Sequence, residues 1–249
     1  EALAADLVNM QVTALAVPGG ASGALAAKRL TTTIPIIFLT GGNAIALGLV
    51  TSLSKPDSNL TGISGFADSL VTKQLGLLGE FVAKSASYGL LVNPLSPNAK
   101  ALVANTQAAA IATGRDMQIV TAENPGELDT AFVQLVDRHA GGLIVPQNSL
   151  FIQQRDHIAA LAARFGIPTI YDARESVVAG GLMSYGINYL ESFRQLGIYT
   201  GKILHGSRPT DLPVLQPSKF DFVINMKTAR ALGLQVPVSM QLLADEIIE

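Results

Sequence analysis

The sequence TIPIIFLTGG, residues 33–42, is apolar without interruption from Ile34 to Leu39 and then ends in a threonine and two glycines. A strand that is covered on both faces has this continuous pattern, whereas a strand with one face in water alternates apolar and polar residues. GGLIVP, residues 141–146, repeats the pattern. Strands covered on both faces are typical of parallel sheets, so the two stretches favour an α/β fold.

Further apolar runs of strand length extend this pattern along the chain, separated by breaks rich in Gly, Pro and Asn and by segments with helical periodicity. Asn124-Pro125-Gly126-Glu127 is typical of a helix start. The pattern predicts a doubly wound α/β protein. The predicted strands are Thr13–Val17, Ile34–Leu39, Leu60–Ser64, Tyr88–Val92, Met117–Thr121, Gly142–Val145, Thr169–Tyr171, Leu182–Tyr185 and Phe220–Asn225.

The composition excludes several classes of protein. The chain has 249 residues, of which 49% are hydrophobic and 14% charged, so it can bury a large core for one big domain or two modest lobes. The net charge of −2 and the scattered basic residues give no surface for nucleic acid or an anionic membrane. The absence of cysteine excludes a cysteine nucleophile and a thiolate metal site. No apolar run approaches the roughly 18 residues that a membrane span needs.

Polar loops follow the predicted strands, and ligands of open parallel sheets bind beyond the carboxyl ends of the strands. The loops are PGGASG (18–23), TGGN (40–43), NPLSPN (93–98), PQNS (146–149) and DARE (172–175). They offer backbone N–H groups and neutral hydrogen-bonding side chains, with almost no base or nucleophile in a catalytic arrangement. The loops therefore favour a binding site over an active site.

The glycines of PGGASG and TGGN suit an anionic ligand, because small residues let it approach the backbone N–H groups at the start of a helix. The alternative is that these glycines only permit tight turns between strand and helix. PGGASG fits neither the dinucleotide fingerprint nor the spacing of a nucleophile elbow around Ser22. Asp172, Arg174 and Glu175 follow a strand end and can contact a ligand amine or carboxylate, although they can equally pair with one another. Tyr185 can stack on a ligand or simply be buried at a strand end.

Longer stretches resemble one family, the periplasmic substrate-binding proteins of bacterial ABC transporters, in the branch that includes tryptophan- and tyrosine-type binding proteins. The stretches cover much of the chain: ALAAKRLTTTIPIIF (24–38), LGLVTSLSKPDSNLTGIS (47–64), LVNPLSPNA (91–99), VVAGGLMSYGINYLESFRQLGIYTGKILHG (177–206) and LPVLQPSKFDFVINMKTARALGL (212–234). The resemblance implies a class I periplasmic-binding fold, which consists of two α/β lobes joined by three crossing segments. It also implies a signal peptide and one further β-α-β stretch ahead of the helix-like start EALAADLVNM.

Mapped onto this chain, the resemblance places residues 1–66 and 174–206 in the first lobe and residues 67–173 and 207–249 in the second. It implies that the loops at Gly20–Ser22 and Thr40–Gly42 bind a ligand carboxylate, while amide side chains contact the ligand from the other lobe. The predicted ligand-binding residues are Gly19, Gly20, Ser22, Thr40, Gly41, Gly42, Asn93, Gln147, Asn148, Asp172 and Tyr185. No cofactor and no metal are expected.

The chain departs from the family at two places. Members often carry an acidic residue near TGGNAI, where this chain has Asn43, and commonly an Asp near Gln147-Asn148. Both changes make the predicted ligand site less acidic.

We expect a non-catalytic, periplasmic solute-binding protein that delivers an aromatic or amino-acid-like carboxylate to an ABC permease. It would meet the membrane only through that permease and bind no nucleic acid. Two alternatives remain at this point: a ligand-sensing domain of the same fold, or an α/β enzyme acting on a sugar phosphate or nucleotide.

Overall fold

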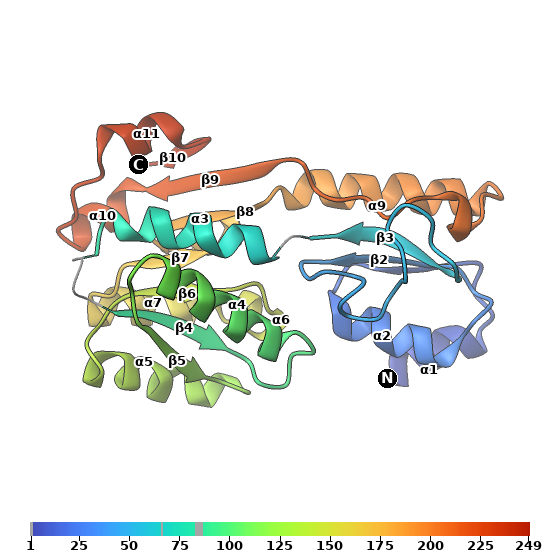
Figure 1. Cartoon of the computed structure of the whole chain (residues 1–249), viewed down its shortest axis with the longest axis horizontal. Coiled ribbons are helices and arrows are strands. Elements are labelled where there is room, and N and C mark those ends of the chain that lie inside the picture. Colours follow the sequence, from blue (N-terminus) through green and yellow to red (C-terminus); the bar gives the residue numbers. More distant parts are fainter. Residues whose placement is uncertain (1, 66, 83–86) are drawn as a thin grey trace. The chain divides into compact units, whose positions relative to one another are not determined.

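The computed structural model describes residues 2–65, 67–82 and 87–249, and the chain divides into two compact units (Figure 1). Unit 1 holds the residues up to Ala67 together with Ile187–Lys219, and unit 2 holds Asp68–Gly186 together with Phe220–Glu249. The chain therefore passes from one unit to the other three times. Two α/β units joined by three chain crossings confirm the predicted fold class.

Unit 1 is built on a three-stranded parallel sheet in the order β1-β2-β3, with strands Leu15–Val17, Ile36–Thr40 and Leu60–Ser64. Helices α1 (Ala2–Asn9), α2 (Ala21–Leu30) and α9 (Tyr189–Leu204) accompany it, with a short 3₁₀ turn at Pro209–Asp211. Leu215 extends the pairing beyond β3 by a bridge to Ile63.

The central strand β2 shows why its sequence is apolar without interruption. Ile36 and Phe38 point into a core with Ala24 and Ala27 of α2, whereas Ile37 and Leu39 point into a second core with residues of α9. Successive side chains of a strand face opposite sides of the sheet, so a strand covered by helices on both sides needs apolar residues at every position.

Unit 2 contains a seven-stranded sheet in the order β10-β9-β8-β7-β6-β4-β5. Its strands are β4 (Ser87–Val92), β5 (Met117–Thr121), β6 (Ala140–Val145), β7 (Thr169–Tyr171), β8 (Met183–Ile187), β9 (Phe220–Asn225) and β10 (Glu246–Ile248). Strands β5, β4, β6, β7 and β8 pair in parallel, as do β9 and β10. The carboxyl ends of β4 to β8 therefore lie along one edge of the sheet.

Helices cover both faces of this sheet. Leu90 and Ile144 point into the core formed with α3 (Ala67–Gly79), α4 (Ala99–Ala112), α10 (Met226–Ala231) and α11 (Val238–Leu243). Leu91 and Leu143 point into the core formed with α5 (Leu128–Asp137), α6 (Ser149–Gln153) and α7 (Arg155–Phe165). The remaining short helix α8 (Arg174–Val178) contacts α7 and β9.

The structure corrects two predicted domain boundaries. Residues 174–186 belong to unit 2, because β8 pairs with β7 and α8 packs on α7 and β9. Residues 207–219 belong to unit 1, because Val214 donates to the carbonyl of Leu53 and the backbone of Leu215 hydrogen-bonds to Gly62 and Ser64 of β3. The third predicted boundary, at Phe66, lies outside the described residues.

The nine predicted strands are all present, and four of them have the predicted bounds: Leu60–Ser64, Met117–Thr121, Thr169–Tyr171 and Phe220–Asn225. The predicted helix start at Asn124 is confirmed, since its side chain accepts from the N–H of Gly126 before the turn that leads into α5. The prediction missed β10, a three-residue strand that pairs with β9.

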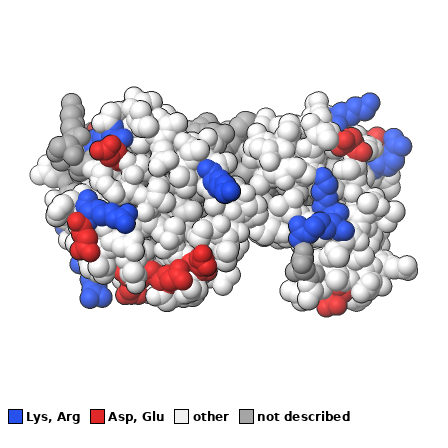
Figure 2. Space-filling view, turned by 60° about the horizontal axis from the view of Figure 1, so that its bottom comes forward, with Lys and Arg blue, Asp and Glu red and all other residues white. Residues whose placement is uncertain are grey.

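Most of the face that Figure 2 shows is uncharged, and its Lys and Arg side chains are spread over it singly or in small groups. Within the described ranges, no helix is both long and apolar enough to cross a membrane.

Candidate functional site

The first predicted loop of unit 1 joins β1 to α2. Gly20 is the N-cap of α2, with a φ of 91° that favours glycine, and a Cβ at Gly19 or Gly20 would meet no atom within 4 Å. Ser22 lies in the first turn, where backbone N–H groups have no partner within the helix. The loop therefore presents an open backbone and a helix N-terminus at the carboxyl end of β1.

The second loop of unit 1, Thr40–Gly42, is held in place by its neighbours. The Thr40 hydroxyl accepts from the N–H of Gly42 (3.2 Å), and the Thr40 carbonyl accepts from the N–H of Gly65 (2.7 Å). The buried hydroxyl of Ser64 donates to the Gly42 carbonyl (3.2 Å) and accepts from the N–H of Ala44 (3.0 Å). The loop is therefore a preorganised part of the sheet edge in unit 1.

Asn43, where the resemblance implies an acidic residue, caps the local turn. Its side-chain oxygen accepts from the N–H groups of Ile45 and Ala46 at 2.9 and 3.1 Å. An aspartate would accept the same two bonds, so the exchange removes a charge while the turn keeps its cap.

In unit 2, amide side chains meet at the carboxyl ends of β4 and β6. Asn148 is the N-cap of α6, accepting from the N–H of Leu150, and its amide donates to the Ser96 hydroxyl at 2.6 Å. The amide of Asn93 donates to the Asn148 oxygen at 3.5 Å. The structure therefore brings Asn93 and Asn148 together as predicted and adds Ser96 to them.

Asp172 is bound to two other elements at the neighbouring strand end. One carboxylate oxygen accepts from the N–H of Gln147 (2.9 Å), and the other accepts from the amide of Gln74 (2.5 Å), which also donates to the Tyr185 carbonyl (2.8 Å). Burial raises the pKa of the Asp172 carboxyl, and the hydrogen bonds from Gln74 and Gln147 partly oppose this shift. Of the two alternatives, pairing of Asp172 with Arg174 is not seen, since Arg174 makes a bidentate pair with Glu246.

The Tyr185 ring is partly buried and stacks on Phe220, with 6.1 Å between ring centroids, and its edge meets Phe222. The other strand-end tyrosine, Tyr171, is fully buried in the core of α5 and α7. The Tyr185 ring thus belongs to an aromatic cluster of unit 2. The backbone carbonyl of the same residue accepts from Gln74.

Ser64 and Gln74, two polar residues at these edges, were not predicted as site residues, and Ser96 was predicted only as part of the NPLSPN loop. The predicted site residues follow strands, whereas Gln74 lies on α3, among the apolar positions of that helix. A polar residue inside an apolar helical stripe is the signal that points to Gln74, because a buried amide needs partners.

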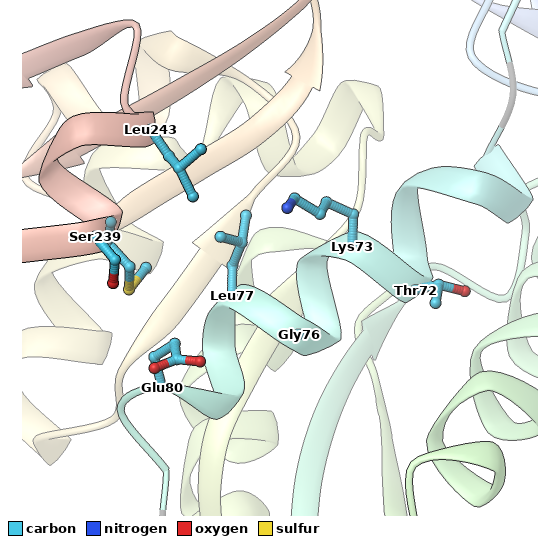
Figure 3. A pocket seen from close by; sticks show the side chains of 8 residues that line it. Thr72, Lys73, Gly76, Leu77, Glu80, Ser239 and Leu243 are labelled. Carbon is cyan, nitrogen blue, oxygen red and sulfur yellow. The ribbon is translucent and has the colours of Figure 1, made fainter. Parts of the chain in front are cut away.

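A separate cavity of about 500 Å³ lies between α3 and α11 in unit 2 (Figure 3). Leu77, Met240 and Leu243 give it apolar walls, and Gly76 leaves room between Lys73 and Glu80. None of the predicted site residues lines it.

The chemistry available at the strand ends is hydrogen bonding to a small ligand. Unit 1 offers backbone N–H groups and hydroxyls, and unit 2 offers amides and the Asp172 carboxylate. Among the described residues, no group of three or more His, Cys, Asp or Glu is arranged to hold a metal ion.

The sequence and the fold are similar to known proteins. The tyrosine-binding protein of Clostridioides difficile is 28% identical over 212 residues, which are 85% of this chain and 61% of that protein. The chain thus spans less than two thirds of that relative's length.

Two crystal structures have the same fold. A conserved domain protein from Vibrio cholerae superposes with a TM-score of 0.91 at 24% identity, covering 98% of this chain and 81% of that one. An ABC domain from Streptococcus pneumoniae, in complex with L-Trp, superposes with a TM-score of 0.90 at 22% identity, covering 99% and 84%.

The model of one protein family, described as ABC transporter substrate binding protein, matches residues 2–248. A match over almost the whole chain, on a fold of two parallel-sheet units with polar loops at the strand ends, decides the family. The chain belongs to the ABC transporter substrate binding proteins.

Proposed function

We propose that this protein is the extracytoplasmic solute-binding component of an ABC importer, and that its ligand is an aromatic amino acid or a similar small carboxylate. The observation that carries the proposal is the set of preorganised, hydrogen-bonding loops at the strand carboxyl ends of both units. The tyrosine-binding relative supports an aromatic ligand, and the family supports a permease as partner and a periplasmic location.

The proposed division of roles follows the chemistry of each loop. The open backbone at Gly19, Gly20 and Ser22 and the Thr40–Gly42 loop bind the ligand carboxylate through N–H groups and hydroxyls. In unit 2, Asp172 accepts from the ligand ammonium. The neutral side chains Asn93, Gln147, Asn148 and Tyr185 complete the contacts with the ligand.

The protein binds and releases the ligand without converting it. Among the described residues at the strand ends, no nucleophile is paired with a base, and the carboxylate among the proposed ligand contacts, Asp172, already accepts from the Gln74 amide and the Gln147 N–H. Contacts from both units to one ligand make binding favour the arrangement in which the units close around it.

The experiment is a titration of the purified protein with L-tyrosine, L-tryptophan, leucine, glucose and a nucleotide. Binding is measured by calorimetry and by the shift in thermal unfolding. A ligand at a hundred times its Kd adds about 2.7 kcal/mol to the free energy of unfolding. For a chain of this size that corresponds to a rise in Tm of about 5–11 °C.

Binding of an aromatic amino acid, weakened in Ser22→Ala and in Asp172→Asn and unchanged in the exposed control Gln107→Ala, supports the proposal. Binding only of the nucleotide would instead favour an enzyme. A ligand-sensing role of the same fold predicts the same titration, and is distinguished by uptake: deletion of the gene would leave import of the solute unchanged.

A further inference from the structure

Gln74 is a buried polar residue on an otherwise apolar helix face. Its exposed fraction is 1%, and it lies on α3 next to Val71, Leu75 and Leu78, which belong to the core of unit 2. A buried amide is costly unless its donors are bonded, so the position needs a compensating contact.

The Gln74 amide nitrogen donates hydrogen bonds to two acceptors that lie in different elements. Nε2 donates to a carboxylate oxygen of Asp172, after β7, and to the carbonyl oxygen of Tyr185, in β8. Tyr185 lies one residue before Gly186, where the chain leaves unit 2. One side chain therefore fixes the end of β7 relative to the end of β8.

The Asp172 carboxylate depends on this bridge for its orientation. Its other oxygen accepts from the N–H of Gln147, and the groups that influence its ionisation are Gln74, Gln147 and the surrounding burial, none of which is cationic. The Gln74 amide is therefore the side chain that stabilises the charged form of Asp172 and holds its direction.

We propose that Gln74 is a positioning residue for ligand recognition: its bridge between Asp172 and Tyr185 orients the Asp172 carboxylate so that the site selects ligands bearing an ammonium group. This inference rests on the proposed function. It goes beyond it by assigning the selectivity to a residue that does not contact the ligand itself.

The test compares two probes at pH 7, L-tyrosine and 3-(4-hydroxyphenyl)propanoate, which differ only in the ammonium group. The variants are Gln74→Met, which keeps the length and apolar packing and loses the donors, Asp172→Asn, the double variant, and Gln107→Met on the exposed face of α4 as control. The readout is the ratio of the two Kd values, because a general loss of structure weakens both probes together.

We expect Asp172→Asn and Gln74→Met each to lower the preference for L-tyrosine about tenfold, and Gln107→Met to leave it unchanged. In the double variant, Gln74→Met adds nothing to the effect of Asp172→Asn, because it acts through that carboxylate. The double variant also removes the unpaired buried charge, so this comparison remains available if Gln74→Met alone does not fold.

The pH profile gives an independent readout, since neither charged group of L-tyrosine titrates between about pH 4 and 8. Affinity for L-tyrosine falls as Asp172 is protonated, and loss of the Gln74 hydrogen bond moves this fall to higher pH.

An unchanged preference in Gln74→Met, with Asp172→Asn lowering it, overturns the inference and leaves the proposed function intact. A further loss on adding Gln74→Met to Asp172→Asn overturns it as well. An unchanged preference in Asp172→Asn refutes the ammonium contact in the proposed function and the inference with it.

Discussion

Gly186 is the position at which a single added methyl group has the largest expected effect on the site. A Cβ there would lie 1.7 Å from the carbonyl oxygen of Asp172, whereas contacts below 3.0 Å are essentially never seen. One of the two backbone segments must therefore move by at least about 1.3 Å. Neither can do so without disturbing the hydrogen bonds of Gln74 to Asp172 and Tyr185.

Overpacking of this kind costs about 1–3 kcal/mol, so Gly186→Ala should lower Tm by about 2–12 °C and weaken ligand binding. Urea unfolding and thermal unfolding measure the change. The control is Gly76→Ala on α3, where an added Cβ meets no atom within 4 Å. It should stabilise the protein by up to about 1 kcal/mol, because alanine is the better helix former. A Gly186→Ala protein as stable as wild type, with unchanged affinity, would refute the reasoning.

Four further predictions concern three buried hydroxyls and a surface ion pair. The buried Tyr171 hydroxyl has no hydrogen-bond partner in the described part of the chain, so Tyr171→Phe should be neutral or stabilising in urea unfolding. Tyr199→Phe should cost about 1 kcal/mol, because the Tyr199 hydroxyl donates to the Pro213 carbonyl at 2.7 Å. Ser64→Ala leaves two backbone groups of the Thr40–Gly42 loop region unpaired and should cost about 1–3 kcal/mol with weaker ligand binding; equal calorimetric titrations would contradict this. The hydrogen bonds from Arg194 lower the pKa of Glu191 to about 2, so its stabilisation is complete above its usual pKa of 4.5 and is lost as pH falls toward 2. Glu191→Gln should flatten the loss of stability between pH 5 and pH 3, and equal slopes would show that the pair contributes nothing.

The fold was predictable because its strands are apolar at every position. Ile36 and Ile37 enter different cores on opposite faces of one sheet. A strand with apolar side chains on both faces is stable only where helices cover both faces, as in a parallel α/β sheet. β10 was not predictable, since Glu246–Ile248 is three residues long and becomes a strand only because β9 offers an unpaired edge. The boundaries at residues 174 and 207 were not predictable either, because they are set by strand pairing and hydrogen bonds between segments far apart in the sequence.

The site was predictable to the extent that it follows strand ends. Asn93, Gln147, Asn148 and Asp172 lie at one edge of the sheet, as expected, because parallel strands place their carboxyl ends along one edge. Gln74 was not, because it reaches that edge from a helix whose register against the sheet is set by tertiary packing. Which of these residues touches the ligand stays a prediction.

The three chain crossings have a consequence for biosynthesis. Unit 2 is completed by Phe220–Glu249, whose residues Phe222, Ile224 and Met240 belong to its core. During synthesis, therefore, β4 to β8 are made first, and the core residues that cover the β8 edge of their sheet follow only after Ile187–Lys219 of unit 1. At about 5–20 residues per second, the 63 residues from Ile187 to Glu249 take roughly 3–13 s to be made. Over that interval the nascent chain offers an exposed sheet edge, so it is a natural client for a holding chaperone.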